Sequence, residues 1–426
     1  MHRSEIDRCV GESLAAQPIT DLHTHCYSPR FGASPQPGAF LLWGIDEMLT
    51  YHYLVAEMYR VVSPAELPYE RFWSLPRAAQ ADHVWKHLFV ERTPLSEACR
   101  GVLTTLQRLG LEPRASSLEA CRKWFAAQDP DRYVDKVLEI AGIDCVTMTN
   151  PVFDDAEREL WLRNPDFGRD PRFRAVLRID PLLRDWPAAS RSLSTWGYSV
   201  GSEFTPKTIS ETKRFVSDWI RRMDAVYVAA SLPPEFRFPA GGGDPCDRML
   251  RDVLLPALAD HGRPLALMIG ARRAVNPALK DAGDASGKAD AASVASLCRE
   301  FPSNKFLVTM LAREDQHELC VTARKFGNLL VFGCWWFLNN PSLVEEITRM
   351  RIELLGTSFV PQHSDARILD QLIYKWEHSK AIIGKVLADK YEALAATGWP
   401  LCPEDIRRDA GRLLRENYRG FVGLPG

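Results

Sequence analysis

The sequence lacks several features that would assign it to a specialised class of protein. Its 426 residues include 53 Lys and Arg against 55 Asp and Glu, so the formal net charge is only −2. A broad basic surface for nonspecific binding to nucleic acid is therefore not expected, and we predict no nucleic-acid partner. With 46% hydrophobic and 25% charged residues, the composition also excludes intrinsic disorder, collagen and coiled coil.

Long apolar runs and closely spaced cysteines are absent as well. The longest apolar stretch, around residues 329–338, has about half of the roughly 20 residues that a membrane-spanning helix needs, so no membrane span is predicted. The N-terminal MHRSEIDRCV has no apolar secretory core, which favours a cytoplasmic location. Ten cysteines without a CxxC pair indicate neither a disulfide scaffold nor a thiolate zinc site.

What the sequence does contain is a series of short apolar runs bounded by turn residues, which is typical of strands buried in a parallel sheet. Residues 211–223, in one of the gaps, have apolar side chains at helical spacing. Strands that alternate with helices in this number predict an α/β fold, a single TIM-type (β/α)₈ barrel over residues 1–426, rather than an open sheet. The eight runs begin near Ile19, Ile143, Phe173, Ala225, Pro264, Lys305, Leu329 and Leu354.

One gap, between Cys26 and Gly142, is too long for a single loop and helix. It contains helix-like segments such as residues 96–110, in which Ser96 is a plausible N-cap and Gly110 a plausible stop. We therefore expect residues 27–141 to form a helical insertion that covers the mouth of the barrel.

The first run ends in two histidines, in the sequence DLHTH at 21–25. Since side chains alternate between the faces of a strand, His23 and His25 point to the same side, which at the carboxyl end of a barrel strand is the active-site mouth. Neutral imidazole is the commonest ligand of zinc and similar ions. The pattern therefore predicts a metal site.

A third metal ligand is expected from another strand end, and Asp365, just after the eighth run, is the strongest candidate. Strands one and eight are neighbours in a closed barrel, so this carboxylate can approach both histidines. Alternatively, Asp365 is a favourable charge at the N-terminus of the helix that follows. The residues alone leave both interpretations open.

Four separated segments carry a more specific pattern when they are taken together: DLHTH at 21–25, HY at 52–53, WWF at 335–337 and DAR at 365–367. In this order they resemble the metal-binding first strand, the His-Tyr element, the WWF motif and the terminal D-x-R signature of the uronate isomerase family, in the amidohydrolase superfamily. The matches span most of the chain. The terminal signature and the paired tryptophans are more specific than the two histidines.

The resemblance implies an isomerase that interconverts an aldose hexuronate and its ketose, such as glucuronate and fructuronate. It implies one divalent metal ion held by His23, His25 and Asp365, with zinc as the first choice and manganese, iron or cobalt as alternatives. The lack of a lysine in the fourth strand favours a single ion over a carbamate-bridged pair. For the base that moves a proton between C2 and C1, Asp365, Tyr53 and a water on the metal all stay open.

The resemblance also implies residues that bind the substrate, a small sugar acid. Arg367 and Arg178 are expected to hold its carboxylate through paired charge-assisted hydrogen bonds, and Arg178 lies in RIDPL, which resembles the family's RPD motif. His52 is a candidate catalytic residue that contacts a sugar hydroxyl. Trp335 or Trp336 is a candidate wall of the cavity, although core packing is the more ordinary role of such tryptophans. No membrane partner is expected, and assembly into a homo-oligomer is left open.

One position departs from the family pattern. Residues 264–277 resemble the family's HIGAxR segment, but Met268 stands where the histidine is usual, and a thioether neither donates a proton nor binds a hard oxygen strongly. Two other functions therefore stay open. One is hydrolysis of a lactone or an amide at a mononuclear metal site, and the other is a noncatalytic barrel that binds a sugar acid.

Two further motifs have ordinary explanations. Residues 197–201 match the G-x-S-x-G nucleophile elbow, but RSLSTW precedes them where the elbow requires an apolar strand, so we interpret them as a turn. His83 and His87 are four residues apart, yet no glutamate completes a HExxH zinc motif, which favours packing.

Overall fold

Parallel strands form the centre of the molecule in the computed structural model, which describes residues 1–34, 36, 38–114, 117–163 and 169–425. The strands form two main sheets, which continue into each other because strands that follow closely along the chain belong to different sheets. One sheet has the order β1 (Ile19–Asp21), β2 (Ile143–Thr147) and β4 (Phe173–Arg174). The other has the order β11 (Leu329–Val331), β10 (Phe306–Met310), β7 (Leu265–Ile269), β6 (Val228–Leu232), β5 (Leu177–Arg178) and β3 (Asn150–Pro151).

Backbone hydrogen bonds then close these strands into a barrel. A parallel bridge joins Phe332 to Val360, and the Gly333 N–H donates to the Val360 carbonyl at 2.8 Å. Beyond Val360, the N–H of Asp365 donates to the carbonyl of His23 at 3.1 Å, so this segment lies beside the end of β1. The architecture is the α/β barrel that the apolar runs predicted.

The eighth strand is shorter and later than the sequence predicted. Helix α17 (Pro341–Leu355) continues through Leu354, where the strand was expected to begin. The helix ends at Gly356, whose φ of +61° reverses the chain direction at low cost for a residue without a Cβ. Among the described residues, only the isolated bridge at Val360 then represents the strand.

Side chains on each barrel strand alternate between two apolar environments. On β7, Leu265, Leu267 and Ile269 belong to the large core between the strands and the outer helices, whereas Ala266 and Met268 belong to the cluster inside the barrel. This period of two is what a strand buried on both faces requires. It directs Met268 toward the barrel interior.

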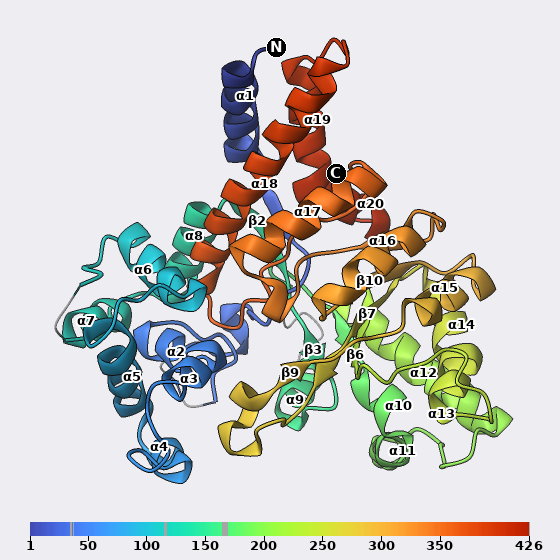
Figure 1. Cartoon of the computed structure of the whole chain (residues 1–426). Coiled ribbons are helices and arrows are strands. Elements are labelled where there is room, and N and C mark those ends of the chain that lie inside the picture. Colours follow the sequence, from blue (N-terminus) through green and yellow to red (C-terminus); the bar gives the residue numbers. More distant parts are fainter. Residues whose placement is uncertain (35, 37, 115–116, 164–168, 426) are drawn as a thin grey trace.

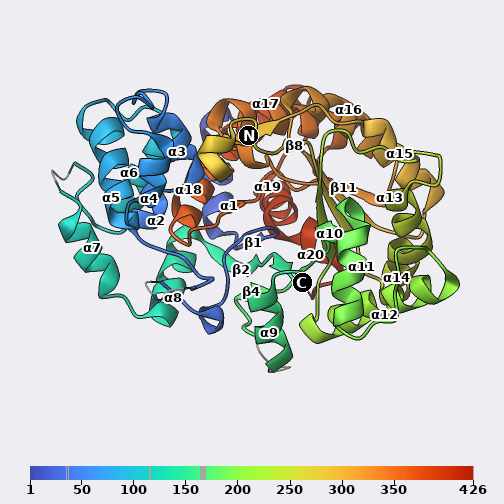
Figure 2. The ribbon, with the colours of Figure 1, turned by 90° about the horizontal axis from the view of Figure 1, so that it is seen from below.

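The outer helices follow the strands in sequence (Figures 1 and 2). The expected amphipathic helix is α12, whose apolar face is buried. The helices of this layer are α9 (Asp155–Arg163), α10 (Asp180–Arg184), α11 (Trp186–Thr195), α12 (Pro206–Met223), α13 (Pro245–Arg248), α14 (Leu255–His261), α15 (Ala291–Glu300), α16 (Gln316–Ala323) and α17. A small antiparallel hairpin, β8 (Ala271–Arg272) and β9 (Ala285–Ser286), encloses the 3₁₀ segment η4 (Pro277–Gly283).

The segment between β1 and β2 is largely helical and gathers on one side of the barrel (Figure 2). Ser96 is the N-cap of α6, since its hydroxyl accepts the Cys99 N–H at 3.1 Å. The helices are α2 (Ile45–Leu49), α3 (His52–Met58), α4 (Tyr69–Ser74), α5 (Arg77–Trp85), α6 (Glu97–Arg108), α7 (Glu119–Ala126) and α8 (Pro130–Ala141).

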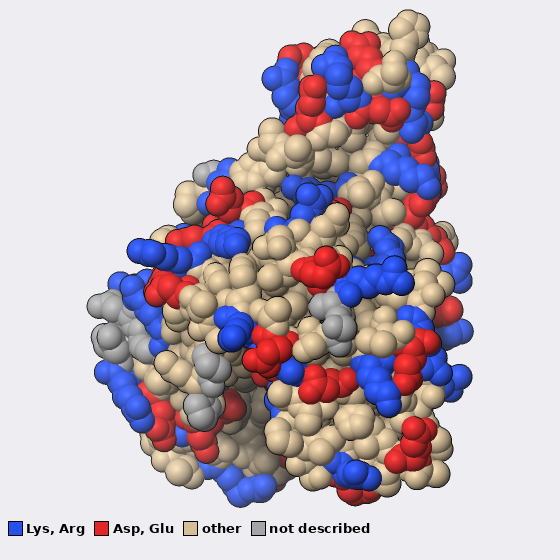
Figure 3. All heavy atoms as spheres, turned by 90° about the vertical axis from the view of Figure 1, so that its left-hand side faces the viewer, with Lys and Arg blue, Asp and Glu red and all other residues tan. Residues whose placement is uncertain are grey.

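Helices from the two terminal regions of the chain form a projection at the top of Figure 1, where α1 (Arg3–Ala16) packs against α18 (Gln371–Ala396) and α19 (Pro403–Gly411). The chain ends with α20 (Asn417–Val422). Figure 3 shows acidic and basic side chains mixed over one face of the molecule, in keeping with the small net charge. Across the described residues, no helix is both long enough and apolar enough to cross a membrane.

Candidate functional site

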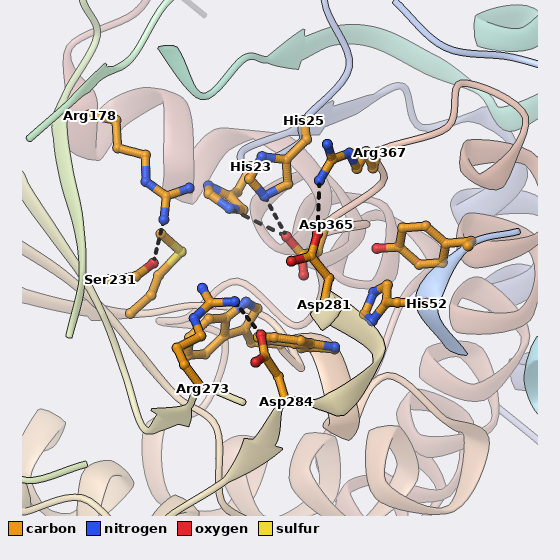
Figure 4. A pocket seen from close by; sticks show the side chains of 14 residues that line it. His23, His25, His52, Arg178, Ser231, Arg273, Asp281, Asp284, Asp365 and Arg367 are labelled. Carbon is orange, nitrogen blue, oxygen red and sulfur yellow. Dashed lines mark hydrogen bonds and ion pairs between the residues drawn. The ribbon is translucent and has the colours of Figure 1, made fainter. Parts of the chain in front are cut away.

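A pocket of about 180 Å³ lies at the carboxyl ends of the barrel strands. Figure 4 shows its side chains converging on a shared space. Seven of the eight site residues chosen from the sequence line it, and Tyr53 does not. The lining consists of His23, His25, Tyr51, His52, Arg178, Ser231, Met268, Arg273, Asp281, Asp284, Trp335, Trp336, Asp365 and Arg367.

The expected metal ligands come together in this pocket. The Nε2 atoms of His23 and His25 each lie 3.4 Å from Oδ1 of Asp365, and one ligand atom from each residue lies within 4.8 Å of the others. The same Asp365 Oδ1 is buried and has no hydrogen-bond partner among the described residues. A buried carboxylate oxygen without a donor is costly unless a cation or a ligand satisfies it.

The charge states of these groups suit metal binding. Burial lowers the pKa of His25 to about 4, so its imidazole is neutral at pH 7, the form that coordinates metals. Burial tends to raise the pKa of Asp365, but the nearby imidazoles of His23 and His25 outweigh it and hold that pKa well below the usual range. The site therefore offers two nitrogen ligands and one carboxylate.

Two residues of the pocket have strained backbones. Asp365 has a φ of +50° and Trp336 a φ of +49°, in the left-handed region that residues with a Cβ seldom occupy. Such conformations cluster at functional sites, where the surrounding structure enforces them. At Asp365 the reversed backbone turns the carboxylate toward the two histidines.

The two candidate arginines occupy different environments. Arg178 is largely buried, and its guanidinium donates to both carboxylate oxygens of Asp180, at 2.7 and 3.0 Å, and to the Ser231 hydroxyl at 3.1 Å. Arg367 is more than half exposed and lies 3.9 Å from Asp281 in a loose ion pair. Arg178 is thus fixed by the protein, whereas Arg367 is available to an anion that enters from outside.

On the wall opposite Arg178 in Figure 4, His52 lies near Tyr51 and Trp336, with ring-centroid distances of 4.1 and 5.4 Å. Burial, with Lys375 as the next cause, lowers the pKa of His52 to about 3, so this imidazole is also neutral at pH 7. Trp335 lines the pocket, as expected from the sequence. These rings make one side of the cavity apolar.

The sequence made Tyr53 a candidate for proton transfer, but Tyr53 does not line the pocket. Its hydroxyl is buried without a hydrogen-bond partner among the described residues, and its ring lies 5.8 Å from Nζ of Lys375. The neighbouring Tyr51 lines the pocket instead. Successive residues at the start of α3 point in different directions, and a two-residue motif does not reveal which of them faces inward.

Sequence reasoning also missed the contribution of the β8–β9 hairpin. Arg273 pairs with Asp284 across this hairpin and lies over the ring of Trp336, and Asp281 of η4 reaches Arg367. Arg273 could have been predicted from the sequence, because it belongs to the segment that resembles HIGAxR. The two aspartates had no signal, since they lie in a Gly- and Pro-rich loop whose path the sequence does not specify.

The two minor motifs do not join the pocket. Ser199 is exposed between α11 and α12 with no strand before it, which agrees with the turn interpretation. The rings of His83 and His87 stack with centroids 6.2 Å apart, and His87 bonds to Glu91 at 2.8 Å.

Comparison with known proteins gives matches among solved structures only, since no protein-family model and no curated protein matches the chain. A uronate isomerase from Bacillus halodurans C-125 has 51% identity and a TM-score of 0.94, with 100% of this chain and 98% of that chain covered. A uronate isomerase from Thermotoga maritima has 15% identity and a TM-score of 0.78, with 99% of each chain covered. A glucuronate isomerase from Caulobacter crescentus has 13% identity and a TM-score of 0.77, covering 100% of this chain and 95% of that chain. The last two likenesses concern the fold alone.

Proposed function

The chain belongs to the uronate isomerase family and is an isomerase, and we propose that it interconverts an aldose hexuronate and its ketose, of the glucuronate and fructuronate type. The observation that carries the proposal is the position of Asp365. Its buried Oδ1 has no hydrogen-bond partner among the described residues and faces the imidazoles of His23 and His25, and Arg178 lines the same pocket. One carboxylate, two imidazoles and an arginine meet the needs of a sugar acid that must lose and regain a proton.

We propose that His23, His25 and Asp365 hold one divalent ion and that this ion is zinc. The donor set fits, because nitrogen and carboxylate ligands suit zinc, and also manganese, iron and cobalt. When bound, such an ion supplies polarisation of the carbonyl and hydroxyl oxygens of the open-chain sugar. Metal analysis of the purified protein tests the identity of the ion.

The arginines are proposed to bind the substrate carboxylate. Arg178 is held in place by Asp180 and Ser231, which reduces the entropy lost when it binds an anion. Arg367 exchanges its loose contact with Asp281 for the substrate's carboxylate. A planar guanidinium matches a carboxylate through two parallel hydrogen bonds.

For proton transfer we propose Asp365, with His52 beside it. Oδ1 of Asp365 faces the histidines, which leaves Oδ2 to accept the proton from C2 and return it to C1. His52, neutral at pH 7, can accept the proton of the hydroxyl on C2 and return a proton to the oxygen on C1, which completes the exchange. Tyr51 is proposed in place of Tyr53 as the hydroxyl donor, since only Tyr51 lines the pocket.

Met268 fills the position of the family's usual histidine and lines the pocket. We propose that it acts as part of the apolar wall, so that proton transfer does not depend on this position. We also propose that residues 27–141 act as one unit that covers the mouth, because α3 contributes His52 to the pocket. A cytoplasmic location stays a proposal that rests on the sequence.

The decisive experiment is NMR of the purified protein with a panel of hexuronates in deuterated water. We expect conversion between aldose and ketose, with solvent deuterium at the carbon that receives the proton, and loss of both in Asp365→Asn and His25→Ala. A lactone and amide panel run in parallel covers the hydrolase alternative. Hydrolysis without any isomerised sugar, or binding without proton exchange, would contradict the isomerase proposal.

A further inference from the structure

A buried lysine that the proposed reaction does not use lies directly behind the metal ligands. Lys375 is in the second turn of α18 and is 2% exposed. Its Nζ donates to the carbonyl oxygen of Ser364 at 2.6 Å. This carbonyl belongs to the peptide bond that joins Ser364 to Asp365. Ammonium groups are rarely buried this deeply without a specific partner.

The backbone of Ser364 is also held at its N–H, in the peptide unit before the one that Lys375 contacts. The N–H of Ser364 donates to the carboxylate of Asp21, at 3.1 and 3.3 Å from its two oxygens. Asp21 is completely buried and also accepts the Nε1–H of Trp376 at 2.7 Å. Lys375 and Trp376, consecutive on α18, therefore hold the backbone of Ser364 on both sides of its Cα, Lys375 at the carbonyl and Trp376, through Asp21, at the N–H.

These contacts with Ser364 are important because the backbone of the next residue, Asp365, is strained. Asp365 keeps its φ of +50° without the conformational freedom of glycine, and neighbouring contacts must enforce this backbone. Lys375 supplies one on the preceding carbonyl, and the Asp365 N–H supplies another by donating to the His23 carbonyl at 3.1 Å. Together they fix the direction of the Asp365 carboxylate relative to His23.

We propose that Lys375 is a positioning residue for the metal site: it holds the Ser364 carbonyl so that the carboxylate of Asp365 stays directed at His23 and His25. This role rests on the proposed function, since it presumes that these three side chains bind an ion. Groups that orient metal ligands from behind usually change metal affinity by 10- to 100-fold when they are removed.

The same helix offers a matched control. Nζ of Lys380 also donates to a backbone carbonyl, that of Leu14 at the end of α1, at 3.3 Å. Lys375→Met and Lys380→Met therefore remove the same kind of bond from the same helix, one behind the metal site and one away from it. Trp376→Phe is a milder variant, which leaves Lys375 in place, removes one of the bonds that hold Asp21 and leaves a small cavity where the buried indole was.

The test is the affinity of chelator-treated protein for Zn²⁺, measured by competition with a chromophoric chelator, together with the thermal unfolding of each metal-free variant. We expect Lys375→Met to weaken Zn²⁺ binding 10- to 100-fold. Trp376→Phe should weaken it less, because Asp21 still accepts the Ser364 N–H. Lys380→Met should lower the unfolding temperature and leave Zn²⁺ affinity unchanged.

Wild-type Zn²⁺ affinity in a folded Lys375→Met protein would overturn the role of Lys375 and leave the proposed function intact. Equal weakening in Lys380→Met would also overturn it, because the effect would then be general destabilisation. If Lys375→Met does not fold, unchanged affinity in Trp376→Phe is the overturning result. A wild-type protein that binds no divalent ion would overturn the metal site itself and this role with it.

Discussion

At the scale of single residues, the pocket separates arginines that the sequence could not tell apart. Arg178 is locked to Asp180, whereas Arg367 is more than half exposed and makes only a loose pair with Asp281. Because Arg178 forms an ion pair with Asp180, it contributes to the stability of the fold as well as to the proposed substrate binding. Arg367, by contrast, contributes little to the stability of the fold and is free to bind an anion that enters the pocket.

Replacing Arg367 with methionine is expected to impair substrate binding without unfolding the protein. A hydrogen bond to a charged group contributes about 1.5–3 kcal/mol, which corresponds to a loss of about 10- to 100-fold in kcat/KM, mainly through KM. Steady-state kinetics with a hexuronate measures this. Arg407→Met, at an exposed ion pair on α19, is the control and should match the wild type.

Replacing Arg178 instead leaves the carboxylate of Asp180 without its charged partner, so this variant should lose stability as well as activity.

For the Arg367→Met prediction, kinetic constants equal to those of the wild type would exclude Arg367 from carboxylate binding.

Glu157 predicts a pH dependence of stability. It is fully buried on α9 and accepts hydrogen bonds from Asn150, Tyr27 and Trp161. Tyr27 has one hydroxyl proton but lies within hydrogen-bond distance of both Glu157 and the Thr149 carbonyl, so a protonated Glu157 suits this arrangement. Burial raises the pKa of Glu157 from 4.5 to about 7.

Because the folded state binds this proton more tightly, the stabilisation is complete below the unfolded pKa and is lost as the pH rises through the folded value. Between pH 4.5 and 7 the contribution of Glu157 to the free energy of unfolding should therefore fall, by about 3 kcal/mol. Glu157→Gln, which does not titrate, should remove this part of the decline. Chemical denaturation of both proteins at several pH values tests it, and parallel curves would contradict the assignment.

At the scale of elements, the end of β11 and the start of the eighth strand depend on one glycine. Gly333 has a φ of +63°, and a Cβ there would lie 1.7 Å from Nδ1 of His363. His363 is completely buried, and its ring lies 5.5 Å from that of His23. The absence of a side chain at Gly333 thus leaves room for the imidazole of His363, which packs against His23.

Gly333→Ala should destabilise the protein by about 2–5 kcal/mol, from the left-handed backbone and the overpacking together. Gly262→Ala, just after α14, is a matched control, because Gly262 is left-handed with a φ of +62° but nothing lies within 4 Å of its Cβ position, so only the backbone cost of about 1–2 kcal/mol remains. Denaturant unfolding compares the two. Equal losses would mean that the contact with His363 does not matter.

At the scale of the whole molecule, the site joins the two ends of the barrel. His23 and His25 follow the first strand and Asp365 follows the eighth, and backbone hydrogen bonds between these segments close the ring. An ion bound by all three side chains would therefore reinforce the closure. It would stabilise the folded chain as any ligand does that binds only the native state.

Removal of the metal is thus expected to lower the unfolding temperature of the entire protein. At a free ion concentration 100 times the dissociation constant, binding contributes about 2.7 kcal/mol. Differential scanning calorimetry before and after chelation, and after Zn²⁺ is restored, measures the shift. His25→Ala should show no metal-dependent shift, and an unchanged temperature in the wild type would contradict a bound ion in the pocket.

The sequence alone determined the architecture, because strands buried on both faces leave apolar runs and their number is that of a closed barrel. It also selected His23, His25, Asp365 and Arg367, which the structure brings into one pocket, because they lie in short motifs at the ends of strands. Only the tertiary structure decided that Tyr51 and not Tyr53 faces the pocket, and that Asp281, Asp284 and Lys375 belong to its surroundings. These side chains are brought there by the path of a hairpin, the rotation of a helix and the packing of α18, which depend on contacts between residues far apart in the chain and leave no local pattern.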